Sequence, residues 1–272
     1  MKIRLDNLLV SRKLVASRSQ AESYIRLGKV LIREKSPQNL AEISGLSFAN
    51  PNKNFAKSGW KKVAKSGIFV DENVEIKLEI AEQFVSRAAL KLQSVAQKLQ
   101  LDFREKTVLD IGSSTGGFTQ FALSRGAKKV IAVDVGTNQL APVLRRDENY
   151  FSRIELHEKT DIRDFKTAAK IDMILADVSF ISLREILPHV AKNLALRKTE
   201  IVAMVKPQFE TGFSAHFKNH GVIKNEKDRR EILKDFEIFA KKYFVIVAKK
   251  DSEVAGAKGN RERFYLLKLI QK

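Results

Sequence analysis

Charged side chains follow two buried strands that the sequence predicts, and these side chains are the first candidates for chemistry. Asp177 comes directly after the apolar run 173–176, and Lys206 comes directly after the run 201–205. Strand carboxyl ends line the ligand crevice of an open α/β sheet, and Pro207 favours extended backbone at Lys206. A lysine in such a crevice can act as a general base once its pKa falls from about 10.4 towards neutrality. Taken singly, each of these residues is more typical of an ordinary surface.

A glycine-rich stretch directly follows the predicted strand 107–111. Glycines let the backbone turn tightly and approach a ligand in front of a helix. Their spacing here differs from G-x-G-x-x-G, which favours S-adenosylmethionine over a dinucleotide, although dinucleotide dehydrogenases share the general pattern. Asp134 ends the second strand, where an acid can take the hydroxyls of an adenosine ribose, and Asp161 follows the third strand, where the adenine amine would be met. The expected donor-binding residues are Asp110, Gly112, Ser113, Gly116, Gly117, Phe118, Asp134, Asp161 and Ile162.

Predicted strands and helices alternate from Thr107 onward, which indicates a doubly wound α/β sheet. The helical stretches are Phe118–Ser124 and Lys227–Lys241. The strands are Thr107–Ile111, Val130–Val133, Met173–Ala176, Ile201–Val205, Tyr243–Val247 and Phe264–Ile270. The last strand has no helix after it, which suits methyltransferases whose sheet ends on a strand inserted antiparallel. We therefore expect a Rossmann-like methyltransferase sheet within a domain of residues 84–272.

Residues 1–79 predict a smaller, basic α+β domain in front of this sheet. Ser17 and Gln20 indicate a capping box, Gly28 can end the helix that follows, and short strands come after it. Residues 1–80 hold 15 Lys and Arg against 8 Asp and Glu. The order of residues over this stretch resembles the S-four domain, a small RNA-binding module named after a ribosomal protein; the alternative is a helical hairpin with a solvated basic face. The resemblance implies RNA contacts from Arg4, Arg12, Lys13, Arg18, Arg26 and Lys29.

Residues 34–62 depart from that module. They are rich in Asn, Ser, Lys and Pro and show no clear period, and a loop of this length is unusual in a compact domain. We expect a mobile insertion between two strands that contacts RNA through Lys53, Lys57, Lys61 and Lys62, with a merely solvated loop as the alternative, and a linker at residues 80–83.

Composition narrows the classes of partner and chemistry. The 272 residues carry a net charge of +18, which fits a polyanionic partner such as nucleic acid. The sequence has no cysteine, which excludes disulfides, thiolate metal sites and the cysteine-dependent methylation of pyrimidine carbon 5. With four histidines, a multi-histidine metal site is not expected. Asp6 and Asn7 stand where a signal peptide would be apolar, and no run is long enough to span a membrane, so we expect a cytoplasmic protein without a membrane partner.

Long motifs connect these observations to one family. They cover residues 85–92, 110–118, 134–140, 176–183, 205–210 and 259–262. In these motifs the chain resembles the TlyA (haemolysin A-like) family of ribosomal RNA 2′-O-methyltransferases, relatives of the FtsJ-type enzymes. The resemblance implies a donor, S-adenosylmethionine, and a substrate, a cytidine 2′-hydroxyl of ribosomal RNA in a ribosomal subunit. It also implies a catalytic tetrad of Lys91, Asp177, Lys206 and Glu262.

Within the implied tetrad we assign Lys206 as the base that takes the proton of the hydroxyl. Lys91 would tune Lys206 and orient the hydroxyl, and the two carboxylates would hold the lysines and the methyl group in line. We also expect Arg87, inside the first motif, to contact RNA.

Three other functions are alternatives to methylation of a ribose hydroxyl. Methylation of a base amine usually requires an Asn/Asp-Pro-Pro-aromatic motif, and Asp177-Val178-Ser179-Phe180 lacks its prolines. A membrane-damaging haemolysin would need apolar spans that the sequence does not show. A non-catalytic RNA-binding or ribosome assembly factor would not need the tetrad. No residue reports which nucleotide or which subunit is the target, and none indicates a protein partner.

Overall fold

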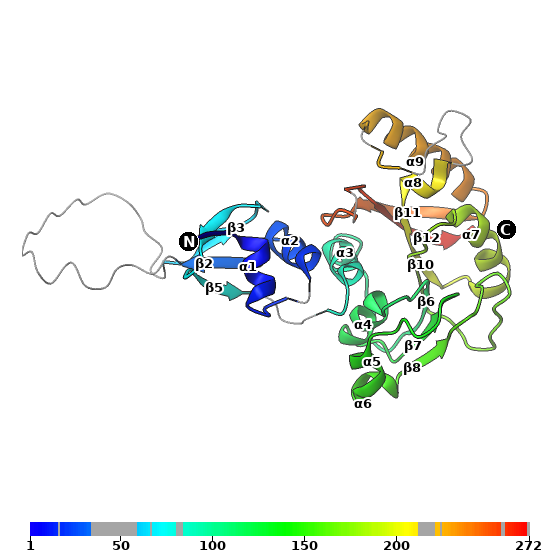
Figure 1. Cartoon of the computed structure of the whole chain (residues 1–272). Coiled ribbons are helices and arrows are strands. Elements are labelled where there is room, and N and C mark those ends of the chain that lie inside the picture. The colour runs from blue at the N-terminus through cyan, green and yellow to red at the C-terminus, as the bar shows by residue number, and fades with distance from the viewer. Residues whose placement is uncertain are drawn as a thin grey trace, which may run out of the picture. The chain divides into compact units, whose positions relative to one another are not determined.

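The computed structural model of the chain describes residues 1–15, 17–33, 59–65, 67–79, 84–211, 221–223, 225–256 and 259–270. These residues form two compact units, Met1–Gln83 and Phe84–Lys272 (Figure 1). The linker that we expected at 80–83 and residues 34–58 of the expected insertion lie outside the described residues.

The first unit is a small α+β structure. Its helices are α1 (Leu5–Ser11) and α2 (Arg18–Arg26), and their apolar sides bury Leu5, Leu9, Tyr24 and Ile25. The oxygen Oγ of Ser17 accepts a hydrogen bond from the Gln20 N–H, and Gly28 ends α2 in the left-handed conformation with φ +63°. The strands are β1 (Lys2–Arg4), β2 (Val30–Arg33), β3 (Lys61–Val63), β4 (Phe69–Asp71) and β5 (Glu75–Leu78).

The strands of the first unit form two small antiparallel sheets. One pairs β1 with β4, and the other has the order β3-β2-β5. Lys61 and Lys62 pair with Ile32 and Leu31 across β2 and β3, so our placing of both lysines in a loop was wrong. The cause is that their backbones complete the hydrogen-bond ladder of β2, for which a lysine side chain facing solvent is no obstacle.

The second unit is built on a seven-stranded sheet with the order β11-β12-β10-β9-β6-β7-β8. Five neighbouring strands from β10 to β8 are parallel, and β12 is antiparallel to both β10 and β11. This confirms the expected α/β fold with its final antiparallel strand. The strands are β6 (Thr107–Ile111), β7 (Lys129–Val133), β8 (Ile154–His157), β9 (Met173–Ala176), β10 (Glu200–Val205), β11 (Phe244–Asp251) and β12 (Arg263–Leu269).

Helices cover both faces of this sheet (Figure 1). They are α3 (Arg87–Ala96), α4 (Gly117–Ser124), α5 (Pro142–Arg146), α6 (Glu148–Phe151), α7 (Leu183–His189), a π-helical turn (Val190–Leu194), α8 (Pro207–Glu210) and α9 (Glu226–Ala240). We did not expect the short helices α5, α6 and α8 or the π-helical turn, since four or five residues give little periodic signal. No helix among the described residues is long and apolar enough to cross a membrane.

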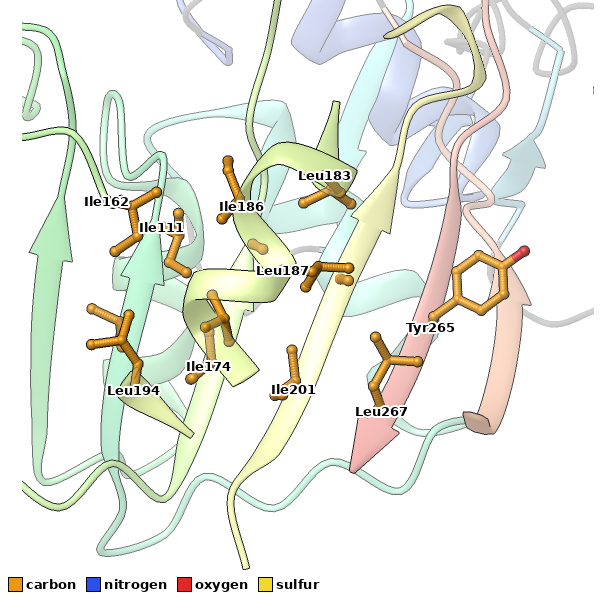
Figure 2. Packing of buried hydrophobic residues seen from close by; sticks show 14 of the residues in the cluster. Ile111, Ile162, Ile174, Leu183, Ile186, Leu187, Leu194, Ile201, Tyr265 and Leu267 are labelled. Atoms are coloured by element: carbon orange, nitrogen blue, oxygen red, sulfur yellow. The ribbon is translucent and has the colours of Figure 1, made fainter. Parts of the chain in front are cut away.

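A buried cluster joins one face of the sheet to α7 and α9. Figure 2 shows Leu183, Ile186 and Leu187 of α7 facing Ile174 of β9 and Ile201 of β10. Each fully buried side chain of this kind stabilises the fold by about 1.5–3 kcal/mol. On the other face Phe118 of α4 stacks against Phe264 of β12, with ring centroids 6.1 Å apart. Because both faces are covered, the strands are held rigidly, and their carboxyl ends can present side chains in a fixed geometry.

Candidate active site

Two of the four predicted catalytic residues meet where β9 and β10 end. These strands run parallel with Ala176 opposite Ala203, so Asp177 and Lys206 leave the sheet at the same edge. The amine Nζ of Lys206 lies 2.6 Å from Asp177 Oδ1 and donates a hydrogen bond of 2.7 Å to Ser179 Oγ. The side chains of Lys206 and Asp177 are 11% and 14% exposed, so the pair is shielded from bulk water but can be reached from the crevice.

The other two predicted catalytic residues form a second ion pair. Lys91 lies on α3, and Glu262 directly precedes β12. Nζ of Lys91 donates a hydrogen bond of 2.9 Å to Glu262 Oε1. Glu262 is 2% exposed, and its second oxygen, Oε2, has no hydrogen-bond partner among the described residues. A buried carboxylate with one unpaired oxygen is costly, which indicates that its position serves more than packing.

Cavities bring the two pairs to a common space. One cavity of about 250 Å³ is lined by Lys91, Asp177 and Lys206 together with the glycine-rich loop. A second cavity, of about 520 Å³, is lined by Lys91, Lys206 and Glu262 together with aromatic side chains. All four predicted tetrad residues therefore line these two cavities, which share Lys91 and Lys206. The fold thus brings together Lys91 and Glu262, which are 171 positions apart in the sequence.

A third cavity, of about 330 Å³, lies along the ends of β6, β7 and β9. Three of the predicted donor-binding residues, Asp134, Asp161 and Ile162, line it, and the apolar side chains of Ile111 and Val133 form part of its wall. Gly112 and Asp177 line both this cavity and the one that holds the lysines. The third cavity thus has acidic groups, Asp134 and Asp161, beside an apolar wall, and it reaches the predicted tetrad at Asp177.

The acids in this third cavity are held by nearby donors. Asp134 accepts hydrogen bonds from the backbone N–H groups of Ser114 and Gly136, at 2.8 and 2.7 Å, which fixes its carboxylate at the end of β7. Asp161 forms a two-point contact with Arg163, whose hydrogen bonds lower the pKa of Asp161. Both carboxylates are held in place before any ligand binds, which reduces the entropy cost of binding.

The glycine-rich loop approaches the sheet edge closely. Gly112 has φ +79°, and a Cβ there would lie 2.7 Å from the carbonyl oxygen of Asp177. Any other residue would therefore be strained and would push the loop away from β9. Ser113, Gly117 and Phe118 line the cavity of the lysines, whereas Gly116 packs against Leu140 and Leu144 beneath the loop.

Asp110 lies below the loop and lines none of the three cavities among the described residues. It is completely buried, and its oxygen Oδ2 accepts a hydrogen bond of 2.6 Å from the Thr119 hydroxyl. Burial raises the pKa of Asp110 to about 7, against the lowering effect of the Thr119 hydrogen bond, and the negative charge of Asp177 adds to the rise. The position predicts a supporting role for Asp110 beneath the donor site.

Three further residues at the site, Ser179, Phe180 and Phe209, lie within the sequence motifs but were not predicted to have a role. Ser179 contacts Lys206, and Phe180 is 92% exposed with φ +67° and lines two cavities. The rings of Phe180 and Phe209 lie 5.5 Å apart, and Phe209 is 5.9 Å from Lys206 Nζ. An exposed aromatic side chain in a strained conformation next to charged groups is typical of a ligand-binding surface. A polar or aromatic residue two or three positions after Asp177 or Lys206 could have been assigned from the strand ends alone.

A buried carboxylate connects the two loops that carry Asp177 and Lys206. Glu210, at the end of α8, accepts hydrogen bonds from the Ser182 hydroxyl and from the Leu183 N–H at the start of α7. It is 2% exposed, and burial raises its pKa. The loop after β9 is thus tied to the helix after β10.

The predicted RNA-contacting residues fall into four groups. Arg4 and Arg18 both bind the buried Asp6, and the Arg4 hydrogen bond, against the effect of burial, helps lower the pKa of Asp6 to about 2. Arg12 donates to the carbonyl oxygens of Glu72 and Val74, so it supports the fold of the first unit. The exposed residues of that unit without an ion pair among the described residues include Lys13 and Arg26, and Lys29 is half-buried. In the second unit Arg87 lines both cavities that hold Lys91 and Lys206.

Comparison with known proteins places this arrangement in a family. Residues 84–269 match the FtsJ-like methyltransferase model. The 23S rRNA (cytidine-2′-O)-methyltransferase TlyA of Campylobacter jejuni is 37% identical over 260 residues, which cover 95% of this chain and 97% of that protein. The 16S/23S rRNA (cytidine-2′-O)-methyltransferase TlyA of Mycobacterium tuberculosis is 33% identical, over 97% of this chain and 89% of that protein.

A solved structure from Streptococcus thermophilus agrees over the whole chain. It is 31% identical, with a TM-score of 0.63, and the match covers 100% of this chain and 90% of that one. The similarity thus extends over both units of the chain and is not confined to the methyltransferase sheet. The chain belongs to the FtsJ-like methyltransferase family and is a TlyA-type RNA methyltransferase homologue.

Proposed function

We propose that the protein transfers a methyl group from S-adenosylmethionine to the ribose 2′-hydroxyl of a cytidine in ribosomal RNA. The observation that carries the proposal is the pair of lysine–carboxylate contacts around one connected set of cavities, in a chain 33–37% identical to enzymes named for this reaction. The relatives differ in the subunit RNA that their names give, so the subunit remains open.

The donor site is suited to S-adenosylmethionine. Asp134, held by two backbone N–H groups, would take the ribose hydroxyls of the donor, and the apolar slot beside Ile162 would hold its adenine. The glycine-rich loop would hold its amino-acid part next to the lysines. When bound, the donor supplies a methyl group on a positively charged sulfur, which needs no metal ion to activate it.

Lys206 has the contacts that a base needs. A neutral amine carries two N–H donors and one lone pair. Ser179 Oγ accepts a hydrogen bond from Lys206, and Asp177 Oδ1 lies 2.6 Å from the same amine. The lone pair is then left to take the proton of the ribose hydroxyl, and the ammonium that forms lies beside the Asp177 carboxylate. Lys91 would bind the hydroxyl oxygen from the other side, with Glu262 keeping its amine in place.

The exposed aromatic surface fits a nucleotide substrate. Phe180 and Phe209 line the 520 Å³ cavity together with Lys206, and base–aromatic stacking contributes about 1–3 kcal/mol per base. We infer that the target nucleotide is taken out of its helix and stacked there, so that its ribose reaches the lysines.

The direct test is methylation of ribosomal subunits isolated from cells without this protein. Purified protein and labelled donor are expected to add a methyl group to a cytidine ribose, and the same position should be unmodified before the reaction. A substrate with a 2′-deoxy sugar at that position should be inert. Methylation of the deoxy substrate would locate the methyl group on the base and contradict the proposal.

The first unit is proposed to contribute RNA affinity through its exposed cations. Replacing Lys13 and Arg26 by Gln should weaken RNA binding and reduce its salt dependence, because phosphate contacts release counterions. Neither residue has an ion pair among the described residues, so the fold should be retained. Methyl-donor affinity serves as the control and should not change; unchanged RNA affinity would give this unit another role.

A further inference from the structure

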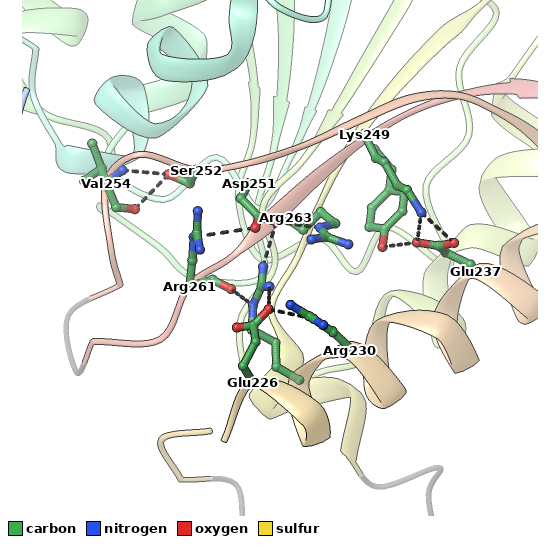
Figure 3. Close-up of polar contacts among 11 residues, drawn as sticks. Glu226, Arg230, Glu237, Lys249, Asp251, Ser252, Val254, Arg261 and Arg263 are labelled. Atoms are coloured by element: carbon green, nitrogen blue, oxygen red, sulfur yellow. Dashed lines mark hydrogen bonds and ion pairs between the residues drawn. The ribbon is translucent and has the colours of Figure 1, made fainter. Parts of the chain in front are cut away.

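Glu262 lies on the connection from β11 to β12. Its two neighbours in the chain, Arg261 and Arg263, both contact the carboxylate of Asp251. Asp251 ends β11 opposite Arg263, the first residue of β12. Its oxygen Oδ1 accepts a hydrogen bond of 2.5 Å from Arg263 Nε, and Oδ2 lies 3.5 Å from Arg261 Nε (Figure 3). One carboxylate thus holds the side chains on both sides of Glu262.

A buried arginine from α9 completes this cluster. Arg229 is 3% exposed, its terminal nitrogen donates a hydrogen bond of 2.7 Å to Asp251 Oδ1, and its Nε donates one of 3.0 Å to the carbonyl oxygen of Arg261. The Ser252 N–H donates to the carbonyl oxygen of Glu262 at 2.9 Å. The backbone at Arg261 and Glu262 is therefore held by hydrogen bonds at two successive carbonyl groups.

The cluster differs from the ordinary surface pairs next to it. Burial by itself would raise the pKa of Asp251, but hydrogen bonds from Arg263 and Arg229 lower it to about 2, so the carboxylate is ionised at neutral pH. Arg230, the next residue on α9, is 76% exposed and, among the described residues, reaches the cluster only through Glu226 Oε1, which lies 3.4 Å from Arg230 and also accepts a hydrogen bond of 3.1 Å from Arg229. A buried, fully charged contact is retained here, at the base of a loop that ends in a tetrad residue, although an apolar contact could give similar stability.

We propose that Asp251 and Arg229 are positioning residues for methyl transfer, which hold residues 261–263 so that the Glu262 carboxylate stays on Lys91. The inference rests on the function proposed above. Neither residue lines any of the three cavities, so they act through Glu262 and not on the substrate.

Arg229→Gln and Arg230→Gln form a matched pair of variants on adjacent positions of one helix. Arg229→Gln is expected to lower kcat by roughly 10- to 100-fold, because a shift of about 1 Å in a catalytic group has effects of this size. KM for RNA and the Kd for methyl donor should stay within about twofold, since ground-state contacts are untouched. Arg230→Gln should retain wild-type kcat. Arg229→Lys should restore little, because one ammonium cannot replace the two-directional guanidinium.

Three measurements distinguish positioning from a general loss of stability. First, kcat is expressed per methyl-donor site measured by calorimetry, so unfolded protein does not count. Second, Asp251→Asn, which keeps the shape of the side chain, should show the same defect. Third, in a Glu262→Gln background Arg229→Gln should cause no further loss, since its effect passes through that carboxylate.

Full kcat in both Arg229→Gln and Asp251→Asn, or an equal loss with and without Glu262→Gln, would overturn the positioning role. A crystal structure of Arg229→Gln supplies a readout that does not depend on activity: the Lys91–Glu262 contact should be lengthened or broken, and an unchanged 2.9 Å contact would contradict the proposal. Wild-type protein that does not methylate ribosomal RNA would instead count against the proposed function.

Discussion

The two lysine–carboxylate pairs of the site are built in different ways. Lys206 and Asp177 follow neighbouring parallel strands, and the register of β9 and β10 alone brings them to one edge. Lys91 and Glu262 come from a helix and from a loop between antiparallel strands, and no shared ladder sets their distance. Lys206 of the first pair also donates a hydrogen bond to Ser179, whereas the amine of Lys91 donates, among the described residues, only to Glu262 itself.

This difference shows which of the two pairs needs side-chain contacts, in addition to the backbone of the sheet, to fix its geometry. Backbone hydrogen bonds of a sheet covered on both faces position the first pair, so it needs little additional support. The second pair depends on side-chain packing and on the charged cluster at Asp251, which together replace the missing strand register. We therefore expect the sheet pair to be sensitive to changes in its own chemistry and the other pair to be sensitive also to changes nearby.

The largest effect is expected at the sheet pair itself. Lys206→Arg should lower kcat by roughly 100- to 10,000-fold, the usual contribution of a general base, because a guanidinium stays protonated and cannot accept the proton. Single-turnover methylation of ribosomal subunits measures this step. Methyl-donor and RNA affinities should remain near wild type, and a variant with full activity would remove Lys206 from the role of base.

A smaller but clear effect is expected when the second pair is disturbed from outside. A Cβ on Gly256 would lie 2.5 Å from Glu262 Oε1, so Gly256→Ala should push this carboxylate away from Lys91. We expect kcat to fall by about tenfold or more, in line with the sensitivity of reaction rates to small displacements.

Gly221→Ala is the matched control for that variant. A Cβ on Gly221 meets no atom within 4 Å, so the substitution should leave kcat unchanged. If both alanine variants retained wild-type activity, Glu262 would tolerate displacement, and the contrast between the two pairs would be lost.

The same contrast explains what the sequence could and could not predict. Asp177 and Lys206 could be assigned from strand ends, because the register of parallel strands is implicit in the alternating pattern. Lys91 and Glu262 entered the predicted tetrad through a family resemblance, and their pairing with each other was not predicted, since residues 171 positions apart leave no local signal of a contact. The Asp251 cluster went unnoticed because charges in an amphipathic helix such as α9 usually face solvent, and Arg229 is buried only through tertiary packing.

The donor site shows a similar limit. Asp134 and Asp161 line the cavity beside β6, β7 and β9, but Asp110, also predicted to bind the donor, is buried beneath the glycine-rich loop and contacts Thr119. Residues on a strand alternate between its two faces, and the motif alone does not say which face the ligand occupies. Strand β3 was not predicted because its backbone and its side chains point to different structures. The backbones of Lys61 and Lys62 pair with β2, but consecutive lysine side chains are typical of a loop.

A modest effect is expected from Ser179→Ala, which removes the acceptor of the Lys206 hydrogen bond and leaves the ion pair with Asp177 and the second pair in place. A single hydrogen bond contributes about 0.5–1.5 kcal/mol, so kcat should fall by roughly 2- to 10-fold. The pH dependence of kcat under single-turnover conditions should change as well, since the surroundings of the amine change. An unaltered rate and profile would show that Asp177 alone holds Lys206.

The smallest effect on methyl transfer is expected from Asp110→Asn. This substitution removes a buried carboxyl group near Asp177, and we expect it to change mainly the free energy of unfolding. The pKa of Asp110 is about 7 in the folded protein and near its ordinary value of 3.8 in the unfolded chain. Below pH 3.8 both states are protonated, so the group costs nothing. Between this value and about 7 the unfolded chain loses its proton while the folded protein keeps it, so wild-type stability falls as pH rises.

Asparagine cannot ionise, so the advantage of Asp110→Asn over the wild type should grow from about pH 4 to pH 7 and then level off. The gain should reach at most a few kcal/mol, because one pKa unit corresponds to about 1.4 kcal/mol. Denaturant unfolding at several pH values measures it, with Asp102→Asn as a control at an exposed carboxylate whose pKa is lowered by Arg104. A difference between wild type and Asp110→Asn that stays constant with pH would show that Asp110 is ionised in the folded protein. In that case its charge would act on Asp177 directly, and the sheet pair would depend on its surroundings as much as the second pair does.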